Sequence, residues 1–186
     1  MPHINPTGVD LVVTAFVVHP TEPKVLLVHH KKLGLWLGPG GHVEPRETTD
    51  EALVRELKEE TGLVIGETAF VLESAEDHIR KTRWDAFDPA ETNNTRMLYQ
   101  PVAVEVHDFP PLPGHRHLAL VYVLKAKTDK VVLEDAHHEI RWFYDGDLDA
   151  LPAGTLLPSI RAYVRHALWK DRWGAAIDFA RLASCR

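Results

Sequence analysis

The sequence predicts a single α+β domain, and three observations support this prediction. Valine-rich segments of strand length lie on both sides of one helix that carries capping signals at both ends. The 186 residues are 45% apolar and 26% charged, close to the averages for globular proteins. A chain of this length is usually one domain, and no segment has the composition of a linker. We therefore expect residues 1–186 to form one domain, with residues 153–186 as a C-terminal helical extension packed on it.

Strands are expected where short apolar runs lie between turn residues. Residues 9–18 are rich in valine and bounded by Gly8 and Pro20, so we expect a buried strand, joined by a hairpin-type turn to a second strand at 24–30. Four glycines and a proline fall within residues 34–41, which is typical of a shaped loop. Later in the chain we expect strands at 69–73, 97–107, 118–126 and 140–144, and irregular structure in the polar segment 74–95.

The segment 48–61 has the strongest helix signals in the chain. Thr48 and Glu51 have the spacing of a capping box, in which each side chain binds the backbone of the other residue. Two leucines four residues apart form an apolar stripe, and Gly62 follows in a position that favours a left-handed conformation. A second helix is expected near the C-terminus, where apolar residues recur at helical spacing over 160–168.

Three carboxylates share one face of the first of these helices. Glu56, Glu59 and Glu60 occupy positions i, i+3 and i+4. Like charges at this spacing destabilise a helix by roughly 0.2 to 0.5 kcal/mol per pair, unless a cation neutralises them. Oxygen ligands of this kind suit Mg²⁺ or Mn²⁺. The spacing alone favours a solvated acidic helix face, so the surrounding residues must decide between the two interpretations.

The residues around the three carboxylates favour the metal site. The glycine-rich loop directly precedes the helix, so its backbone could approach the same cation or a phosphate. Arg55 adjoins the carboxylates, and Glu47 lies eight residues earlier, where a Glu–Arg pair could tie the loop to the helix. The alternative interpretation of this pair is two unrelated surface charges.

Together these residues form the pattern Gly41-x₅-Glu47-x₇-Arg55-Glu56-Leu57-x-Glu59-Glu60-x-Gly62-Leu63. The pattern resembles the complete Nudix box, the signature of the Nudix hydrolase family, with every fixed position present over residues 41–63. The resemblance extends to Trp36 and Pro39-Gly40 before the box, to the strand pair at 9–30 and to the strand that begins at Ile140.

The resemblance implies both a fold and a reaction. The fold is an α/β/α sandwich, with a mixed β-sheet between helices and a loop–helix–loop catalytic motif. The reaction is that of a diphosphohydrolase: Mg²⁺- or Mn²⁺-dependent hydrolysis of a nucleoside diphosphate linked to another moiety. By position, the metal-binding and catalytic carboxylates are Glu56, Glu59 and Glu60, the backbone ligand is Gly40, and the structural pair is Glu47 with Arg55.

The base that accepts the proton of the attacking water is open at this stage. Glu56 is the first choice because it lies on the correct helix face. Other family members take the base from a loop outside the box. The corresponding candidates here, either as base or as an extra ligand, are Glu134, Asp135 and Glu139, each of which could equally be a solvated loop carboxylate.

Two other functions compete with the enzyme. The first is a Nudix-like module that binds a nucleotide or ADP-ribose without turnover, although such modules usually lose box carboxylates. The second is isopentenyl-diphosphate isomerase, whose glutamate spacing differs from that seen here. The substrate is open among oxidised nucleotides, nucleoside diphosphate sugars, dinucleoside polyphosphates and capped RNA.

Charge and composition limit the partners. The net charge of −6 provides no strongly basic surface, so general nucleic-acid binding is not expected. No apolar run reaches the length of a membrane span, and the single cysteine, Cys185, favours a reducing, cytoplasmic setting. A homodimer would be common for the family. His115 and His117 could contact metal or phosphate, or could simply be surface or supporting histidines.

Overall fold

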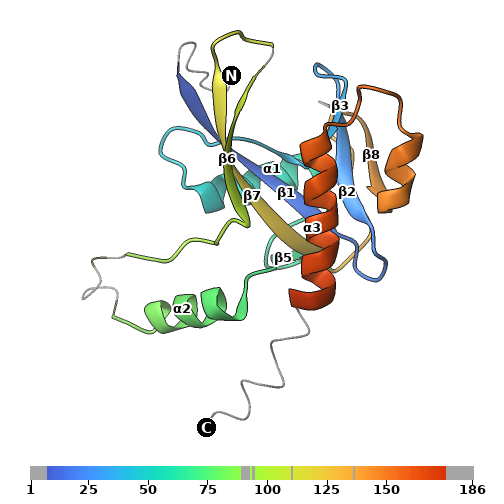
Figure 1. The fold of residues 1–186 in the computed structure, drawn as a ribbon. Coiled ribbons are helices and arrows are strands. Elements are labelled where there is room, and N and C mark those ends of the chain that lie inside the picture. The colour runs from blue at the N-terminus through green and yellow to red at the C-terminus, as the bar shows by residue number, and fades with distance from the viewer. Residues whose placement is uncertain (1–7, 89–92, 94, 110, 136, 175–186) are drawn as a thin grey trace.

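A mixed β-sheet lies between two helices in the computed structural model, which describes residues 8–88, 93, 95–109, 111–135 and 137–174 (Figure 1). Within these residues the sheet has eight strands, and its main path runs β3-β2-β1-β7-β5. β1 and β7 are parallel over their whole paired length, whereas the other paired strands are antiparallel. The predicted α+β sandwich with a mixed sheet is therefore confirmed.

The strands are β1 (Val9–Val18), β2 (Val25–His30), β3 (Leu35–Leu37), β4 (Gly40–His42), β5 (Ala69–Val71), β6 (Ala103–Asp108), β7 (Arg116–Ala126) and β8 (His137–Phe143). The helices are α1 (Thr49–Thr61), α2 (Ala75–Asp85) and α3 (Pro158–Gly174), with a short 3₁₀ helix at Asp145–Ala150. Residues 175–186 of the expected C-terminal extension lie outside the described residues.

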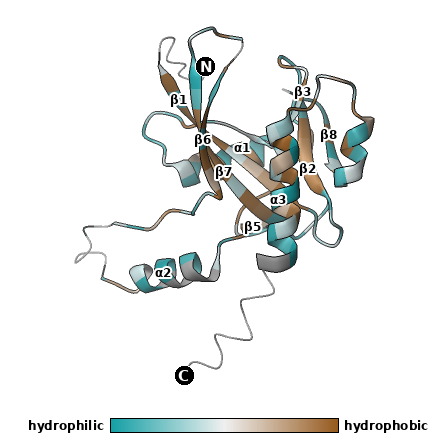
Figure 2. Ribbon diagram, viewed as in Figure 1, coloured by the Kyte–Doolittle hydropathy of each residue, from teal (hydrophilic) through white to brown (hydrophobic). Residues whose placement is uncertain are grey.

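Each face of the sheet carries its own apolar core. Leu53 and Leu57 of α1 pack with β1 and β7 on one face. Val164 and Ala167 of α3 pack on the other face. Figure 1 accordingly shows α1 behind the sheet and α3 in front of it, and Figure 2 shows β1 and β7 as mainly apolar through the centre. Both faces of these strands are covered, which explains their nearly continuous runs of apolar residues.

Helix α1 begins and ends where the sequence predicts. The Thr48 side chain accepts a hydrogen bond from the Glu51 backbone N–H, and the Glu51 carboxylate accepts one from the Thr48 backbone. Gly62 caps the other end with a φ of 73°, and its N–H donates to the carbonyl of Lys58. These caps fix the length of the helix that carries the candidate site.

The structure corrects two local predictions. Residues 75–85 form α2 within the segment expected to be irregular; Ser74 caps this helix, and its side chain accepts from the Asp77 N–H. The helix is hard to find in the sequence because it carries mainly polar residues. The strand expected at 97–107 begins only at Ala103, since Pro101 has no N–H to donate and the Tyr99 N–H donates to the Asp50 carboxylate.

The segment expected as a loop at 34–41 forms the short strand β3 and the first two residues of β4. β4 pairs with β1 through Val12↔His42 and Thr14↔Gly40, which fixes the backbone that precedes α1. None of the helices in the described part of the chain is long and apolar enough to cross a membrane.

Candidate active site

Arg55 joins the loop to the helix. Its Nε donates to Glu47 Oε1 and its Nη2 to Glu47 Oε2, both at 2.9 Å. Nη2 also donates to the backbone carbonyl of His42 at 2.9 Å, and Glu47 accepts from the Glu44 N–H at the same distance. These hydrogen bonds lower the pKa of Glu47 below its ordinary value. The expected Glu47–Arg55 pair is therefore present as a two-point contact between loop and helix.

Glu60 contacts the glycine-rich loop directly. Its Oε2 accepts a hydrogen bond from the Gly40 N–H at 2.8 Å, and its side chain is almost completely buried. Gly40 has a φ of 152°, and a Cβ atom there would lie 2.1 Å from the Val13 carbonyl oxygen. Only glycine can therefore bring the loop backbone to this position beside Glu60.

Glu56 lies against the neighbouring glycine. A Cβ atom at Gly41 would lie 2.5 Å from Glu56 Oε1, so the missing side chain makes room for the carboxylate. Arg55 Nη1 donates to Glu56 Oε1 at 2.7 Å. Burial raises the pKa of Glu56 to about 7, although the Arg55 hydrogen bond and charge act in the opposite direction. A nearby cation would stabilise the ionised form of this carboxylate, which burial makes unfavourable.

Glu59 is the most exposed of the three carboxylates. About half of its side chain is accessible, and its Oε2 lies 3.3 Å from Arg55 Nη1. Arg55 thus contacts both Glu56 and Glu59 while it holds Glu47. The three box carboxylates belong to one face of α1, because their i, i+3, i+4 spacing falls within a single helix.

Of the three carboxylates expected in a loop, Glu134 and Asp135 precede β8, whereas Glu139 lies within this strand, which begins three residues earlier than expected. The structure brings Glu134 to the site. Glu134, Glu60 and His137 each offer a ligand atom, and these atoms all lie within 4.8 Å of one another. The Asp135 side chain is exposed, and its backbone carbonyl accepts from Lys31 Nζ. Glu139 is half exposed and pairs with Arg141 at 3.3 Å. Neither of the latter two contacts a box carboxylate in any described interaction.

His137 is a site residue that the sequence alone did not identify. Its Nε2 lies 2.9 Å from Glu60 Oε1. The side chain is almost fully buried. The signal was present in the pair His137-His138, which opens β8, but only the contact with Glu60 shows that His137 faces α1.

A groove of about 460 Å³ runs along another face of α1 and is lined by Asp50, Glu51, Val54, Arg55, Lys58, Lys81, Arg96, Met97 and Tyr99. Val54 and Lys58 are four residues apart and face away from Glu56 and Glu60 on the helix. Arg55 is the member that this groove shares with the carboxylate cluster. The cationic groove therefore adjoins the candidate active site without containing it.

Comparison with known proteins agrees with this geometry. A family model described as the NUDIX domain matches residues 10–161. The chain is 28% identical over 123 residues to the uncharacterized Nudix hydrolase YvcI of Bacillus subtilis (strain 168), a match that covers 58% of this chain and 75% of YvcI. It is 38% identical over 169 residues to the NAD-capped RNA hydrolase NUDT12 of Pongo abelii, covering 87% of this chain but only 29% of NUDT12.

A solved structure has the same architecture. The crystal structure of a NUDIX-family hydrolase from Clostridium perfringens matches with a TM-score of 0.68 and 27% identity, covering 86% of this chain and 95% of that chain. The family match covers most of the chain, and the box residues have the contacts described above. The chain therefore belongs to the Nudix hydrolases, a family of pyrophosphohydrolases that generally use divalent metal ions.

Proposed function

We propose that this protein is a Mg²⁺- or Mn²⁺-dependent hydrolase that cleaves the diphosphate linkage of a nucleoside diphosphate joined to another moiety. One observation carries the proposal: the carboxylates of Glu56 and Glu60 contact the glycine-rich loop, where Arg55 and Glu47 lock that loop to α1. To bind a charged diphosphate, a site needs several carboxylate oxygens that hold a divalent cation beside a fixed backbone.

The donor set fits a hard divalent cation. Glu56, Glu59 and Glu60 offer carboxylate oxygens, and the Gly40 backbone carbonyl is the proposed fourth protein ligand. When bound, the cation would neutralise the diphosphate, stabilise the leaving group and lower the pKa of a bound water. The cation would also reduce the repulsion among the three neighbouring carboxylates on α1.

The protein's own side chains would orient the reacting carboxylate and accept the proton of the attacking water. Arg55 holds the Glu56 carboxylate through its 2.7 Å hydrogen bond, which orients one oxygen and leaves the other to act. Glu56 is therefore our first choice as general base. Glu134 is the second choice, because it joins Glu60 in one cluster of ligand atoms. Asp135 and Glu139 are weaker candidates, because their described contacts are with groups outside the carboxylate cluster.

The proposed substrate is a nucleotide derivative, and the proposal covers several classes of such compounds. The name of NUDT12 refers to NAD-capped RNA, but this chain spans less than one third of that protein. Oxidised nucleotides, nucleoside diphosphate sugars and dinucleoside polyphosphates belong in the same test. We further propose a single domain with a helical extension, a reducing compartment such as the cytoplasm, and a homodimer that light scattering would test.

A substrate panel tests the proposal. The protein is incubated with each class in the presence of Mg²⁺ or Mn²⁺, and the two phosphorylated products are identified by mass spectrometry. We expect cleavage within the diphosphate of at least one class. Binding of a panel member without turnover would instead support the non-catalytic nucleotide or ADP-ribose sensor.

A further inference from the structure

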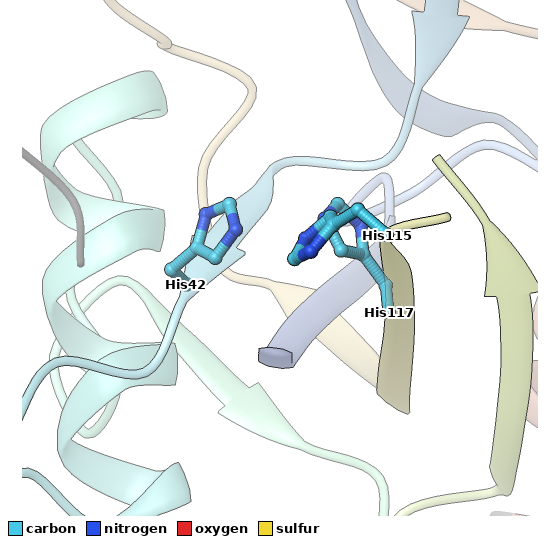
Figure 3. Close-up of side chains that lie close together, drawn as sticks. All are labelled: His42, His115 and His117. Carbon is cyan, nitrogen blue, oxygen red and sulfur yellow. The ribbon is translucent and has the colours of Figure 1, made fainter. Parts of the chain in front are cut away.

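Three histidines from separate segments meet at one end of the sheet. His42 lies at the end of β4, His115 directly precedes β7, and His117 is the second residue of β7. Figure 3 shows the rings of His115 and His117 directed toward that of His42. One ring nitrogen of each lies within 4.8 Å of the corresponding atoms of the other two.

The sheet register explains this meeting. β1 pairs with β4 through Val12↔His42 and runs parallel to β7 through Asp10↔His117. The neighbouring strands thus place all three imidazoles around the start of β1. Asp10 adds a carboxylate to the cluster: its Oδ2 lies 3.6 Å from His42 Nε2 and 3.5 Å from His115 Nε2.

The histidine cluster is mostly buried. His115 and His117 are almost fully buried, and Phe109 stacks on the His117 ring at 4.6 Å. His42 keeps one fifth of its side chain exposed. Within the described residues, Nε2 of His42 and Nε2 of His117 are buried and make no hydrogen bond. Buried polar atoms in this state are costly unless a further partner satisfies them.

The chemistry of the donors selects one class of partner. Neutral imidazoles are characteristic ligands of Zn²⁺ and related transition metals, whereas Mg²⁺ prefers oxygen. Burial and the neighbouring histidines lower the pKa of His117 to about 4, which keeps its ring neutral near pH 7. The Asp10 carboxylate faces Nε2 of His42 and of His115, so its oxygen can bind the same ion.

We propose that His42, His115 and His117 bind one transition-metal ion of the Zn²⁺ class, with the Asp10 carboxylate as an additional ligand. The site is separate from the box carboxylates and does not depend on the proposed function. It would fasten β4, which carries Gly40 and Gly41, to β7, and so would stabilise the backbone on which the active site is built.

Zinc binding to the full chain tests the proposal. Metal-stripped protein is titrated with Zn²⁺ against a chromophoric chelator, with Mg²⁺ in large excess to occupy oxygen-rich sites. We expect one equivalent of tightly bound Zn²⁺, and X-ray absorption of this complex should show three imidazole ligands. Binding should also raise the melting temperature as free Zn²⁺ exceeds the dissociation constant.

Matched variants locate the ion. His115→Ala, His117→Ala and His42→Ala should each weaken Zn²⁺ binding by about a hundredfold or more, because losing a ligand costs more than losing an outer partner. Asp10→Asn keeps an oxygen ligand but removes its negative charge, so it should weaken Zn²⁺ binding by only about tenfold. His166→Ala on α3 and His137→Gln in the Glu60–Glu134 cluster are controls, and both should retain the wild-type affinity.

Two results would overturn the proposal even if the buried histidine variants failed to fold. The first is a wild-type protein that holds no Zn²⁺ under these conditions, or holds it through oxygen ligands alone. The second is a folded His42→Ala protein with unchanged Zn²⁺ affinity; His42 is partly exposed, so this replacement is the least disruptive to packing.

Discussion

The two groups of potential metal ligands are neighbours in space but differ in origin. The carboxylate cluster comes from one helix, and its contacts to Gly40 and Gly41 lie within the same continuous segment. The histidine cluster joins residues more than seventy positions apart through the register of β1, β4 and β7. β4 takes part in both clusters, because its Gly40 N–H donates to Glu60 and its last residue, His42, is one of the three histidines. The two clusters therefore share one short strand. The carboxylate cluster can be predicted from a single sequence segment, whereas the histidine cluster cannot.

The two clusters also differ in charge. Crowded carboxylates gain most from a hard divalent cation, whereas neutral buried imidazoles gain most from a zinc-like ion. Variants that affect one cluster should leave the metal affinity of the other unchanged. The following predictions test this separation, beginning with the largest expected effect.

Glu60→Gln should reduce kcat by at least about a hundredfold. Glutamine keeps the side-chain volume and can still accept from the Gly40 N–H, but it removes a negative charge from the proposed metal site. Losing one anionic contact in the transition state should cost on the order of 3 kcal/mol, and each 1.36 kcal/mol is about tenfold in rate. Steady-state kinetics at saturating Mg²⁺ measure the effect.

The control for this variant is the stability of the metal-free protein. Its melting temperature should be unchanged or higher than that of the wild type, because one of several crowded like charges is removed. Its Zn²⁺ affinity at the histidine cluster should also be unchanged. Normal kcat in Glu60→Gln would refute the assignment of this residue to the active site.

Gly41→Ala should reduce kcat by about ten- to a hundredfold without altering any ligand. The new Cβ would lie 2.5 Å from Glu56 Oε1, so the carboxylate must shift, and small misplacements at a reacting centre have effects of this size. Gly146→Ala is the matched control, since no heavy atom within 4 Å would meet its Cβ. Equal kcat values for the two alanine variants would show that the contact with Gly41 does not position Glu56.

Glu47→Gln should have the smallest effect on turnover, about tenfold, together with a loss of about 1 to 2 kcal/mol in the free energy of unfolding. Its role is to hold the loop through two hydrogen bonds from Arg55, and hydrogen bonds to charged groups contribute amounts of this order. Chemical denaturation with the metal-free protein measures the stability, and a crystal structure of the variant should show a displaced loop.

The stability difference between wild type and Glu47→Gln should depend on pH. Arg55 lowers the pKa of Glu47 in the folded protein below the ordinary value of 4.5. Its stabilisation is therefore complete above that ordinary value and is lost as the pH falls through the lowered folded-state pKa. A difference that stays constant under acidic conditions would contradict the Glu47–Arg55 interaction.

The sequence predicts the fold and the carboxylate cluster well because their signals are local. The capping box at Thr48, the closing Gly62 and the glutamate spacing all lie within one segment. α2 is missed because a polar helix lacks apolar periodicity. His137 and the meeting of His42 with His117 are missed for a different reason: strand pairing decides them, and no single window of the sequence contains that information.

The most direct test of the central claim is the turnover of metal-stripped protein as Mg²⁺ is returned. The carboxylates of Glu56, Glu59 and Glu60 cannot offset the charge of a diphosphate without a cation. We therefore expect no turnover on the substrate panel after EDTA treatment, and recovery of activity when Mg²⁺ or Mn²⁺ is added. Full turnover in metal-free buffer would contradict the account.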